Sequence, residues 1–118
     1  NDDPVISMLY RYLDTPLPSD WGLKDIRQRR EWLRDPGGDP TQPRGDEKRT
    51  RVCAAEFICE VLGKDLADKE FKYLARRISK AISKLPNWEK VSSTRHAERL
   101  YGIQRGFKRV DGFEEEDL

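Results

Sequence analysis

The stretch DKEFKYLARRISKAISKL, residues 68–85, decides the fold class of this chain. Its apolar residues recur at intervals of three and four, which places their side chains on one face of an α-helix. Asp68 can cap the start of such a helix, and Pro86 follows its expected end. The spacing therefore predicts a helix from about Asp68 to Leu85, either continuous or as a short and a longer helix meeting near Tyr73. The apolar positions are Phe71, Leu74, Ala75, Ile78, Ala81, Ile82 and Leu85.

The opposite face of this helix is strongly basic. Several Lys and Arg residues lie three or four positions apart, and only Glu70 opposes them. Positive charges this close together repel one another, and a bound polyanion is the simplest way to offset that repulsion. A helix fits the DNA major groove, where Arg and Lys reach guanine edges and phosphates, although a basic face is also common as a plain solvated surface. The basic residues are Lys69, Lys72, Arg76, Arg77, Lys80 and Lys84.

A basic hairpin is expected after the helix. Residues Leu100–Val110 combine Tyr, Ile, Phe and Val with two glycines, which predicts two short strands. A helix across Ser93–Leu100 is the alternative for the preceding stretch. The positive bias of the helix recurs around this hairpin, which favours DNA binding over a solvated surface. Its basic residues are Arg95, Arg99, Arg105, Lys108 and Arg109.

Further helices are expected upstream, at about Asp3–Leu13, from Asp20 or Leu23 to Leu33, and at Glu47–Leu62. A loop rich in Pro and Gly, residues 35–46, separates the last two. Two helices followed by a basic hairpin are the parts of a winged helix-turn-helix. We therefore expect a mainly α, small α+β fold, in which a helical N-terminal segment precedes a winged helix-turn-helix-like domain with a short β-hairpin.

The charge distribution divides the chain into three parts. Residues 1–43 carry a net charge of −2, residues 44–110 carry 17 basic and 9 acidic side chains, and residues 111–118 carry −5. We assign the N-terminal helical segment and its Pro/Gly-rich linker to residues 1–43, and the winged-helix-like basic domain to residues 44–110. The acidic stretch 111–118 is expected to be a disordered, solvated tail. A basic middle part indicates a polyanionic partner, here DNA.

Motifs for catalysis or cofactor binding do not occur in the sequence. It contains no GxxxxGK[ST], GxSxG, HExxH or CxxC. Cys53 and Cys59 lie six positions apart, which turns them to different faces of a helix, so we expect two unpaired core thiols rather than a disulfide or a zinc site with His96. No catalytic residue, metal or cofactor is expected, and an independent nuclease is the least favoured function.

Other side chains have simpler interpretations. The three tryptophans, Trp21, Trp32 and Trp88, are expected to pack in the core rather than to stack on bases. The arginine cluster Arg27–Arg30 either extends a DNA surface or forms local ion pairs with Asp25 and Glu31. Neither a signal peptide nor a membrane-spanning stretch occurs in the pattern, so we expect no membrane association and interpret the chain as a cytoplasmic fragment of a longer protein.

Four blocks of sequence resemble the C-terminal region of virulence-associated E family proteins. The blocks are WGLKDIRQRREWL, RTRVCAAEFICEVLGKD, RRISKAISKLPNWEKV and YGIQRGFKRV, and the resemblance extends from about Pro4 to Val110. These proteins belong to phages and mobile elements and are related to replicative primase/helicase ATPases. The family usually has a polar turn before the recognition-helix block, where this chain has the helical pattern DKEFKYLA. That departure leaves open where the first of the two helices ends.

The resemblance implies that an ATPase domain precedes this chain in the parent protein, inside a bacterial host cell. The chain would then be a non-catalytic accessory domain that binds DNA during replication of a phage or genomic island. A protein-interaction module, or a homo-oligomer formed through the parent protein, is the alternative, with Trp21 and Trp32 packed against a neighbour. The predicted DNA-binding residues are Lys72, Arg76, Arg77, Lys80, Lys84, Arg95, Arg99, Arg105 and Lys108.

Overall fold

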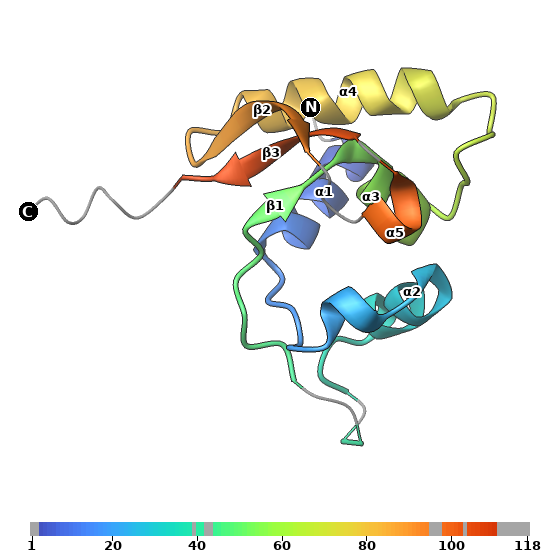
Figure 1. Cartoon of the computed structure of the whole chain (residues 1–118), viewed down its shortest axis with the longest axis vertical. Helices are drawn as coiled ribbons and strands as arrows, with labels where there is room; N and C mark the ends of the chain where they lie inside the picture. Colours follow the sequence, from blue (N-terminus) through green and yellow to red (C-terminus); the bar gives the residue numbers. More distant parts are fainter. Residues whose placement is uncertain (1–2, 39, 42–43, 95–97, 103, 111–118) are drawn as a thin grey trace, which may run out of the picture.

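The computed structural model of the chain describes residues 3–38, 40–41, 44–94, 98–102 and 104–110, and only the backbone of residues 92–94 and 98–99. Its helices and its three-stranded antiparallel sheet make this an α+β fold, as the sequence predicts (Figure 1). The acidic stretch 111–118 lies outside the described residues. In chain order the elements are α1 (Pro4–Asp14), the 3₁₀ helix η1 (Trp21–Leu23), α2 (Ile26–Arg34), β1 (Arg51–Val52), α3 (Ala54–Glu60), α4 (Phe71–Ser83), β2 (Trp88–Thr94), α5 (Glu98–Tyr101) and β3 (Gln104–Arg109).

The sheet has the order β1-β3-β2, with β3 in the centre. Phe107 on β3 lies opposite Val52 on β1 and Lys90 on β2, and both pairings are antiparallel. A pair of antiparallel strands is present, as predicted, but its position differs. The pair is formed by β2 and β3, and Leu100–Val110 supplies only β3. The two glycines suggested a turn, yet Gly106 is buried within β3, opposite Val91. The alternative helix at Ser93–Leu100 corresponds in part to the short α5.

The main core lies between α1, α3, α4 and the sheet. Leu9 of α1, Phe57 of α3, Ile78 of α4 and Phe107 of β3 are all buried in one apolar cluster. Helix α1 thus packs into the same core as the basic part of the chain, although residues 15–43 separate them in sequence. In Figure 1, α4 lies near one end of the long axis and α2 toward the other, with α1 and α3 between them. Trp88 is buried in this core as well, as the sequence predicts.

The helix predicted at Glu47–Leu62 is much shorter, because α3 begins only at Ala54. The preceding residues are extended: Arg51 and Val52 form β1 and pair with β3. Cys53 occupies the N-cap position, where its backbone N–H donates to the Glu56 carboxylate (3.0 Å). A strand of two residues is too short to show a periodicity in its sequence. Its conformation depends on pairing with β3, which lies far away in the sequence. Both Cys53 and Cys59 are free and buried, which confirms the prediction for them.

Helix α4 starts three residues later than predicted. Asp68 lies in the turn before it, where its carboxylate accepts from the N–H of Glu70 (2.8 Å) and its carbonyl from the N–H of Phe71 (3.0 Å). The helical pattern DKEFKYLA had left open where the first of the two helices ends. That helix, α3, ends at Glu60, and a turn follows at residues 65–70. Helix α4 is then continuous from Phe71 to Ser83, without a junction near Tyr73.

The segment between α1 and β1 forms a separate layer against α3. One helix was predicted there, but the structure has η1 and α2, separated at Asp25, which caps α2 through a hydrogen bond from the N–H of Gln28 (2.8 Å). Trp21 and Trp32 are buried against each other, with ring centroids 5.6 Å apart, which confirms that they are packing residues. Among the helices in the described part of the chain, none is long and apolar enough to cross a membrane.

Candidate nucleic-acid interface

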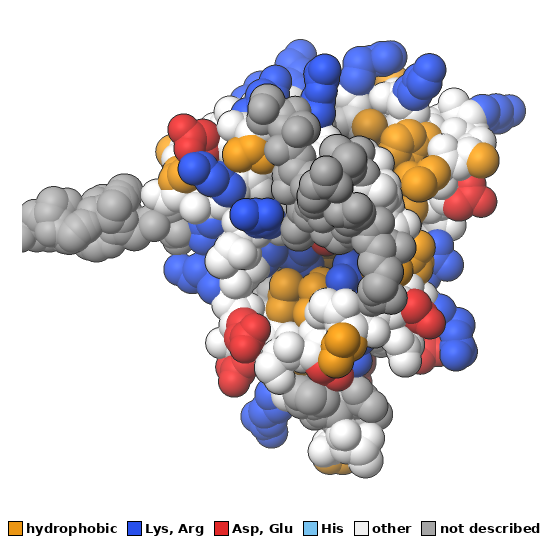
Figure 2. Space-filling model, in the orientation of Figure 1, with side chains coloured by type: hydrophobic (Ala, Val, Ile, Leu, Met, Phe, Trp, Pro, Cys, Tyr) orange, Lys and Arg blue, Asp and Glu red, His pale blue; other side chains and the backbone are white. Residues whose placement is uncertain are grey.

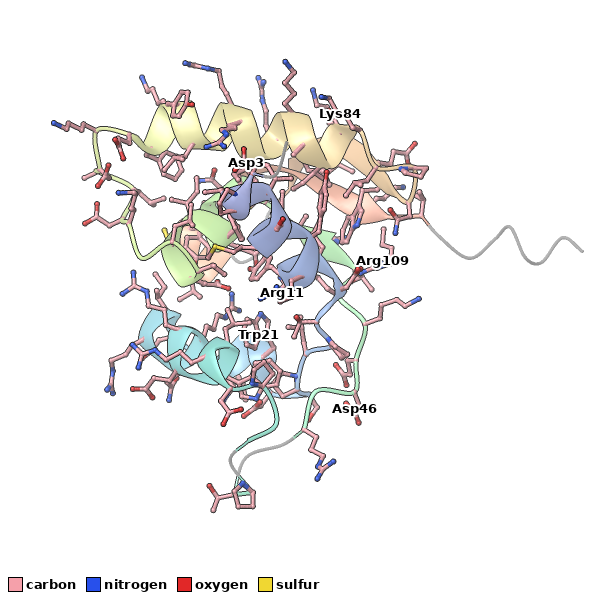
Figure 3. All side chains as sticks on the ribbon, turned by 180° about the vertical axis from the view of Figure 1, so that it is seen from behind. Asp3, Arg11, Trp21, Asp46, Lys84 and Arg109 are labelled. Atoms are coloured by element: carbon pink, nitrogen blue, oxygen red, sulfur yellow. The ribbon has the colours of Figure 1, made fainter. Side chains whose placement is uncertain are left out.

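The outer face of α4 is strongly basic. Leu74, Ile78 and Ile82 hold one face of the helix in the core, and this orientation points the opposite face to solvent. The exposed side chains include a row at four-residue spacing, and Figure 2 shows basic side chains along the edge that α4 forms. Figure 3 shows the same edge from behind, with Lys84 near the C-terminal end of the helix. The row, which we call the α4 basic row, consists of Lys72, Arg76, Lys80 and Lys84.

Negative charge near this row is small. Helix α4 itself contains no acidic residue in its sequence FKYLARRISKAIS. Glu70, at the N-cap position, forms an ion pair with Lys64 (Nζ to Oε1, 3.3 Å). The side chains of this pair are partly exposed, so solvent screens the pair and it neutralises little of the field of the row. The α4 basic row therefore presents a positive surface to solvent.

Arg77, also predicted to bind DNA, lies outside the α4 basic row. Its guanidinium is partly buried and forms an ion pair with the carboxylate of Asp3. That carboxylate also caps α1 by accepting from the N–H of Val5 (3.0 Å). The hydrogen bond from Arg77 lowers the pKa of Asp3 below its ordinary value. Arg77 thus connects α4 to the start of α1.

The β2–β3 hairpin adds a second, smaller basic surface. Arg105 and Lys108 are exposed on β3, and Lys108 lies 3.6 Å from a carboxylate oxygen of Glu89 on the neighbouring strand. Arg109 faces inward instead. Its Nε and Nη2 donate to the carbonyls of Arg49 (2.6 Å) and Leu13 (2.9 Å), and its guanidinium lies over the Trp88 ring. Arg95 and the side chain of Arg99 lie outside the described residues.

Tyr73 is a surface residue of α4, which the sequence suggested only as the place where two helices would meet. It is 58% exposed. It precedes Arg76 by three residues and Lys80 by seven, so it shares the outward face of α4 with them. That spacing was visible in the sequence, and it would have placed an aromatic ring within the basic surface. Leu66, in the turn before α4, is also exposed.

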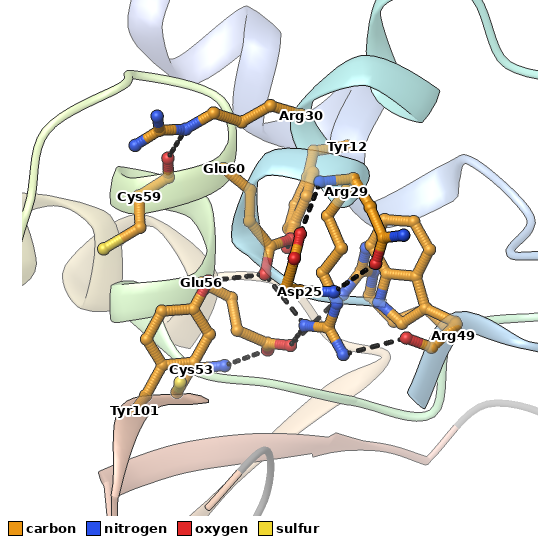
Figure 4. Close-up of polar contacts among 12 residues, drawn as sticks. Tyr12, Asp25, Arg29, Arg30, Arg49, Cys53, Glu56, Cys59, Glu60 and Tyr101 are labelled. Atoms are coloured by element: carbon orange, nitrogen blue, oxygen red, sulfur yellow. Dashed lines mark hydrogen bonds and ion pairs between the residues drawn. The ribbon is translucent and has the colours of Figure 1, made fainter. Parts of the chain in front are cut away.

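The Arg27–Arg30 cluster makes ion pairs and hydrogen bonds within the protein. Arg29 is buried, and its Nη1 lies 2.9 Å from Glu60 and 3.6 Å from Glu56, both on α3 (Figure 4). Arg27 lies 3.7 Å from Glu31, and Arg30 donates to the carbonyl of Cys59 (2.7 Å). Of the two interpretations of the cluster, local ion pairing describes Arg27, whereas Arg29 pairs with carboxylates of α3 that are distant in sequence.

Glu60 is the centre of a closed polar cluster. Besides Arg29, the hydroxyls of Tyr12 (2.9 Å) and Tyr101 (2.7 Å) donate to its carboxylate. Burial raises the pKa of Glu60, the nearby Glu56 carboxylate adds to the rise, and Arg29 opposes it. A raised carboxyl pKa can mark a catalytic acid, but Glu60 is only 3% exposed and is surrounded by its own partners. The geometry therefore fits a structural role, which joins α1, α2, α3 and α5.

Arg49 borders the same cluster. It is buried, its guanidinium lies over the Tyr12 ring (4.0 Å to the centroid), and its Nη1 is 3.9 Å from Glu56. Beside it is a cavity of about 440 Å³, lined among others by Trp21 and Leu100.

Across the described residues, no group of three or more His, Cys, Asp or Glu side chains is arranged to hold a metal ion.

No protein-family model matches this chain, and a comparison with curated proteins gives no match.

Proposed function

We propose that this chain is a winged helix-turn-helix module that binds duplex DNA. The order of α1, β1, α3, α4, β2 and β3, together with the sheet order β1-β3-β2, supports this fold assignment. In it, α3 and α4 are the helix-turn-helix pair, α4 is the recognition helix, and β2–β3 is the wing. The η1–α2 segment is an insertion between α1 and β1.

The observation that carries the proposal is the α4 basic row. Its four cations lie on the exposed face of a helix that contains no acidic residue, and such a helix fits the major groove. Arg76 and Lys80, in the middle of α4, reach base edges or nearby phosphates, whereas Lys72 and Lys84 contact phosphates toward the two ends. Arg105 and Lys108 of the hairpin extend the contact along the DNA backbone.

The wider role rests on the resemblance to the virulence-associated E family. The module would be a non-catalytic accessory domain of a phage or mobile-element replication protein, acting in the bacterial cytoplasm. Its partners would be DNA and the ATPase domain of the parent protein. The module would hold DNA while that ATPase domain works on it.

The test is a salt series of binding to a fluorescent duplex, measured by anisotropy. The Arg76→Glu/Lys80→Glu variant should lose at least about tenfold in affinity, and the slope of log K against log salt should fall by about two. The matched control is Arg27→Glu/Arg34→Glu, which makes the same charge change on exposed residues of α2. Equal losses in both variants, or no loss in the first, would contradict the proposed interface.

The alternative function, a protein-interaction or oligomerisation module, is less well supported. It relied on Trp21 and Trp32 packing against a neighbour, and both are buried within this chain. What favours it is a groove of about 470 Å³ between α1, α2 and α3, lined by apolar side chains such as Met8 and Leu33. Sedimentation distinguishes the two functions, because a salt-insensitive oligomer with no affinity for DNA would favour this one.

A further inference from the structure

Tyr73 is a large apolar side chain that the fold leaves in solvent. Tyr73 is 58% exposed, whereas its neighbour Leu74 is buried in the core. Burial of an aromatic ring is strongly favourable, so the position of Tyr73 contributes less to stability than an inward position would. Its place on the outward face invites a functional explanation.

The surroundings of Tyr73 on the outward face of α4 are basic. Arg76 and Lys80 lie one and two helical turns after it. In the proposed complex this face enters the major groove, where Arg76 and Lys80 reach base edges or nearby phosphates. A ring on the same face then also lies against the base edges.

The position of Tyr73 along the helix agrees with this. It is the third residue of α4, and recognition helices contact bases mainly through their N-terminal residues. In the major groove, the one apolar group that a base pair presents is the 5-methyl group of thymine. An aromatic ring is complementary to that methyl group, whereas Lys and Arg are complementary to guanine.

We infer that Tyr73 is a specificity-determining residue, which packs its ring on a thymine methyl group in the major groove and favours an A·T pair at that position. This inference rests on the proposed DNA-binding function. It adds that the module discriminates between sequences and does not only hold the backbone.

The experiment begins with a duplex pool randomised over about one helical turn, about 10 base pairs. The wild-type chain and the Tyr73→Ala, Tyr73→Phe and Tyr10→Ala variants each select from this pool. Tyr10 is the matched control, since it is an exposed tyrosine that lies on α1 rather than on α4. Affinities are then measured for the duplex that the wild type selects and for the same duplex with uracil in place of thymine.

The wild type, Tyr10→Ala and Tyr73→Phe should each bind the thymine duplex about fourfold more tightly than the uracil duplex, which is what one buried methyl group is worth. Tyr73→Ala should bind both duplexes equally and should select no A·T pair at that position. Its salt slope should match that of the wild type, because no phosphate contact is lost.

Two results would overturn the inference. One is that Tyr73→Ala selects the same sequences as the wild type and keeps the preference for thymine. The other is that Tyr73→Phe loses the preference for thymine, which would assign the discrimination to the hydroxyl rather than to the ring. Either result leaves the proposed function intact if Arg76→Glu/Lys80→Glu still loses binding, and absence of any duplex binding by the wild type would overturn both.

Discussion

Arg29 of α2 and Glu60 of α3 form a buried ion pair, with 2.9 Å between Nη1 and Oε2. Both side chains are almost completely removed from solvent, at 4% and 3% exposure. Burial of two charges is costly, and the pair repays this cost only because further hydrogen bonds satisfy the carboxylate. The contact joins the inserted segment to the proposed DNA-binding unit.

Loss of Arg29 should be strongly destabilising. Arg29→Met leaves the Glu60 carboxylate buried without its cation, which should lower the free energy of unfolding by about 3–5 kcal/mol in urea denaturation. Arg27→Met is the control, because its exposed pair with Glu31 is worth at most about 1 kcal/mol. In the double variant Arg29→Met/Glu60→Gln the charge of Glu60 is gone and Glu56 keeps its pair with Arg49 (3.9 Å), so part of the stability should return. A double variant no more stable than Arg29→Met would refute this explanation.

The Asp3–Arg77 pair should give a pH-dependent contribution to stability. Arg77 lowers the pKa of Asp3 in the folded state below its ordinary value of 3.8. The stabilisation is therefore present above that value and is lost as the pH falls through the folded-state pKa. Asp3→Asn keeps a good N-cap but removes the charge. Thermal unfolding should show a lower Tm for the variant at neutral pH and equal Tm values in acid; a difference that persists in acid would rule out the ion pair as its cause.

Arg77 and Lys80 should behave differently as DNA contacts. Arg77 already faces the carboxylate of Asp3, whereas Lys80 is exposed in the α4 basic row. Lys80→Ala should reduce the salt slope of DNA binding by about one, and Arg77→Ala by clearly less. Thermal unfolding should show the reverse order, with Arg77→Ala the less stable variant. Equal slopes for both variants would place Arg77 in the interface after all.

The two cysteines should be unreactive in the folded protein. Burial raises the pKa of Cys53 to about 12 and that of Cys59 to about 11. Because the thiolate is the reactive form, alkylation by iodoacetamide at about pH 8 should be slow. Addition of denaturant should make both thiols react at the rate of a free cysteine. Mass spectrometry gives the two rates separately, and rapid modification of either thiol without denaturant would contradict its burial.

Local patterns in the sequence were sufficient to predict α4. Its apolar spacing identified the inward residues Leu74 and Ile78, and the basic residues on its other face are the ones that the structure exposes, apart from Arg77. Arg77 is the exception because its environment depends on Asp3, at the far end of the chain. The start of the helix was also missed, since the turn at Asp68 has a composition that a helix tolerates equally well.

Contacts between distant residues explain the other differences. Strand β1 exists because Val52 lies opposite Phe107, and neither residue signals the other in sequence. The polar cluster around Glu60 combines side chains from four helices, including Tyr12 and Tyr101. An isolated Glu in a helical pattern predicts a solvated side chain, so the burial of Glu60 could not be predicted from local sequence.

The inserted segment also bears on how the chain folds. Its ends meet where Leu17 pairs with Glu47 in an isolated bridge, so residues 18–46 leave the core and return at one place. Glu56 and Glu60 are buried, and Arg29 of this segment lies 3.6 Å and 2.9 Å from their carboxylates. Trp21 and Trp32 of the segment are buried as well, so its removal would take away both a cation and apolar packing. We expect a single cooperative transition, in which deletion of residues 18–46 yields an unfolded polypeptide rather than a smaller domain.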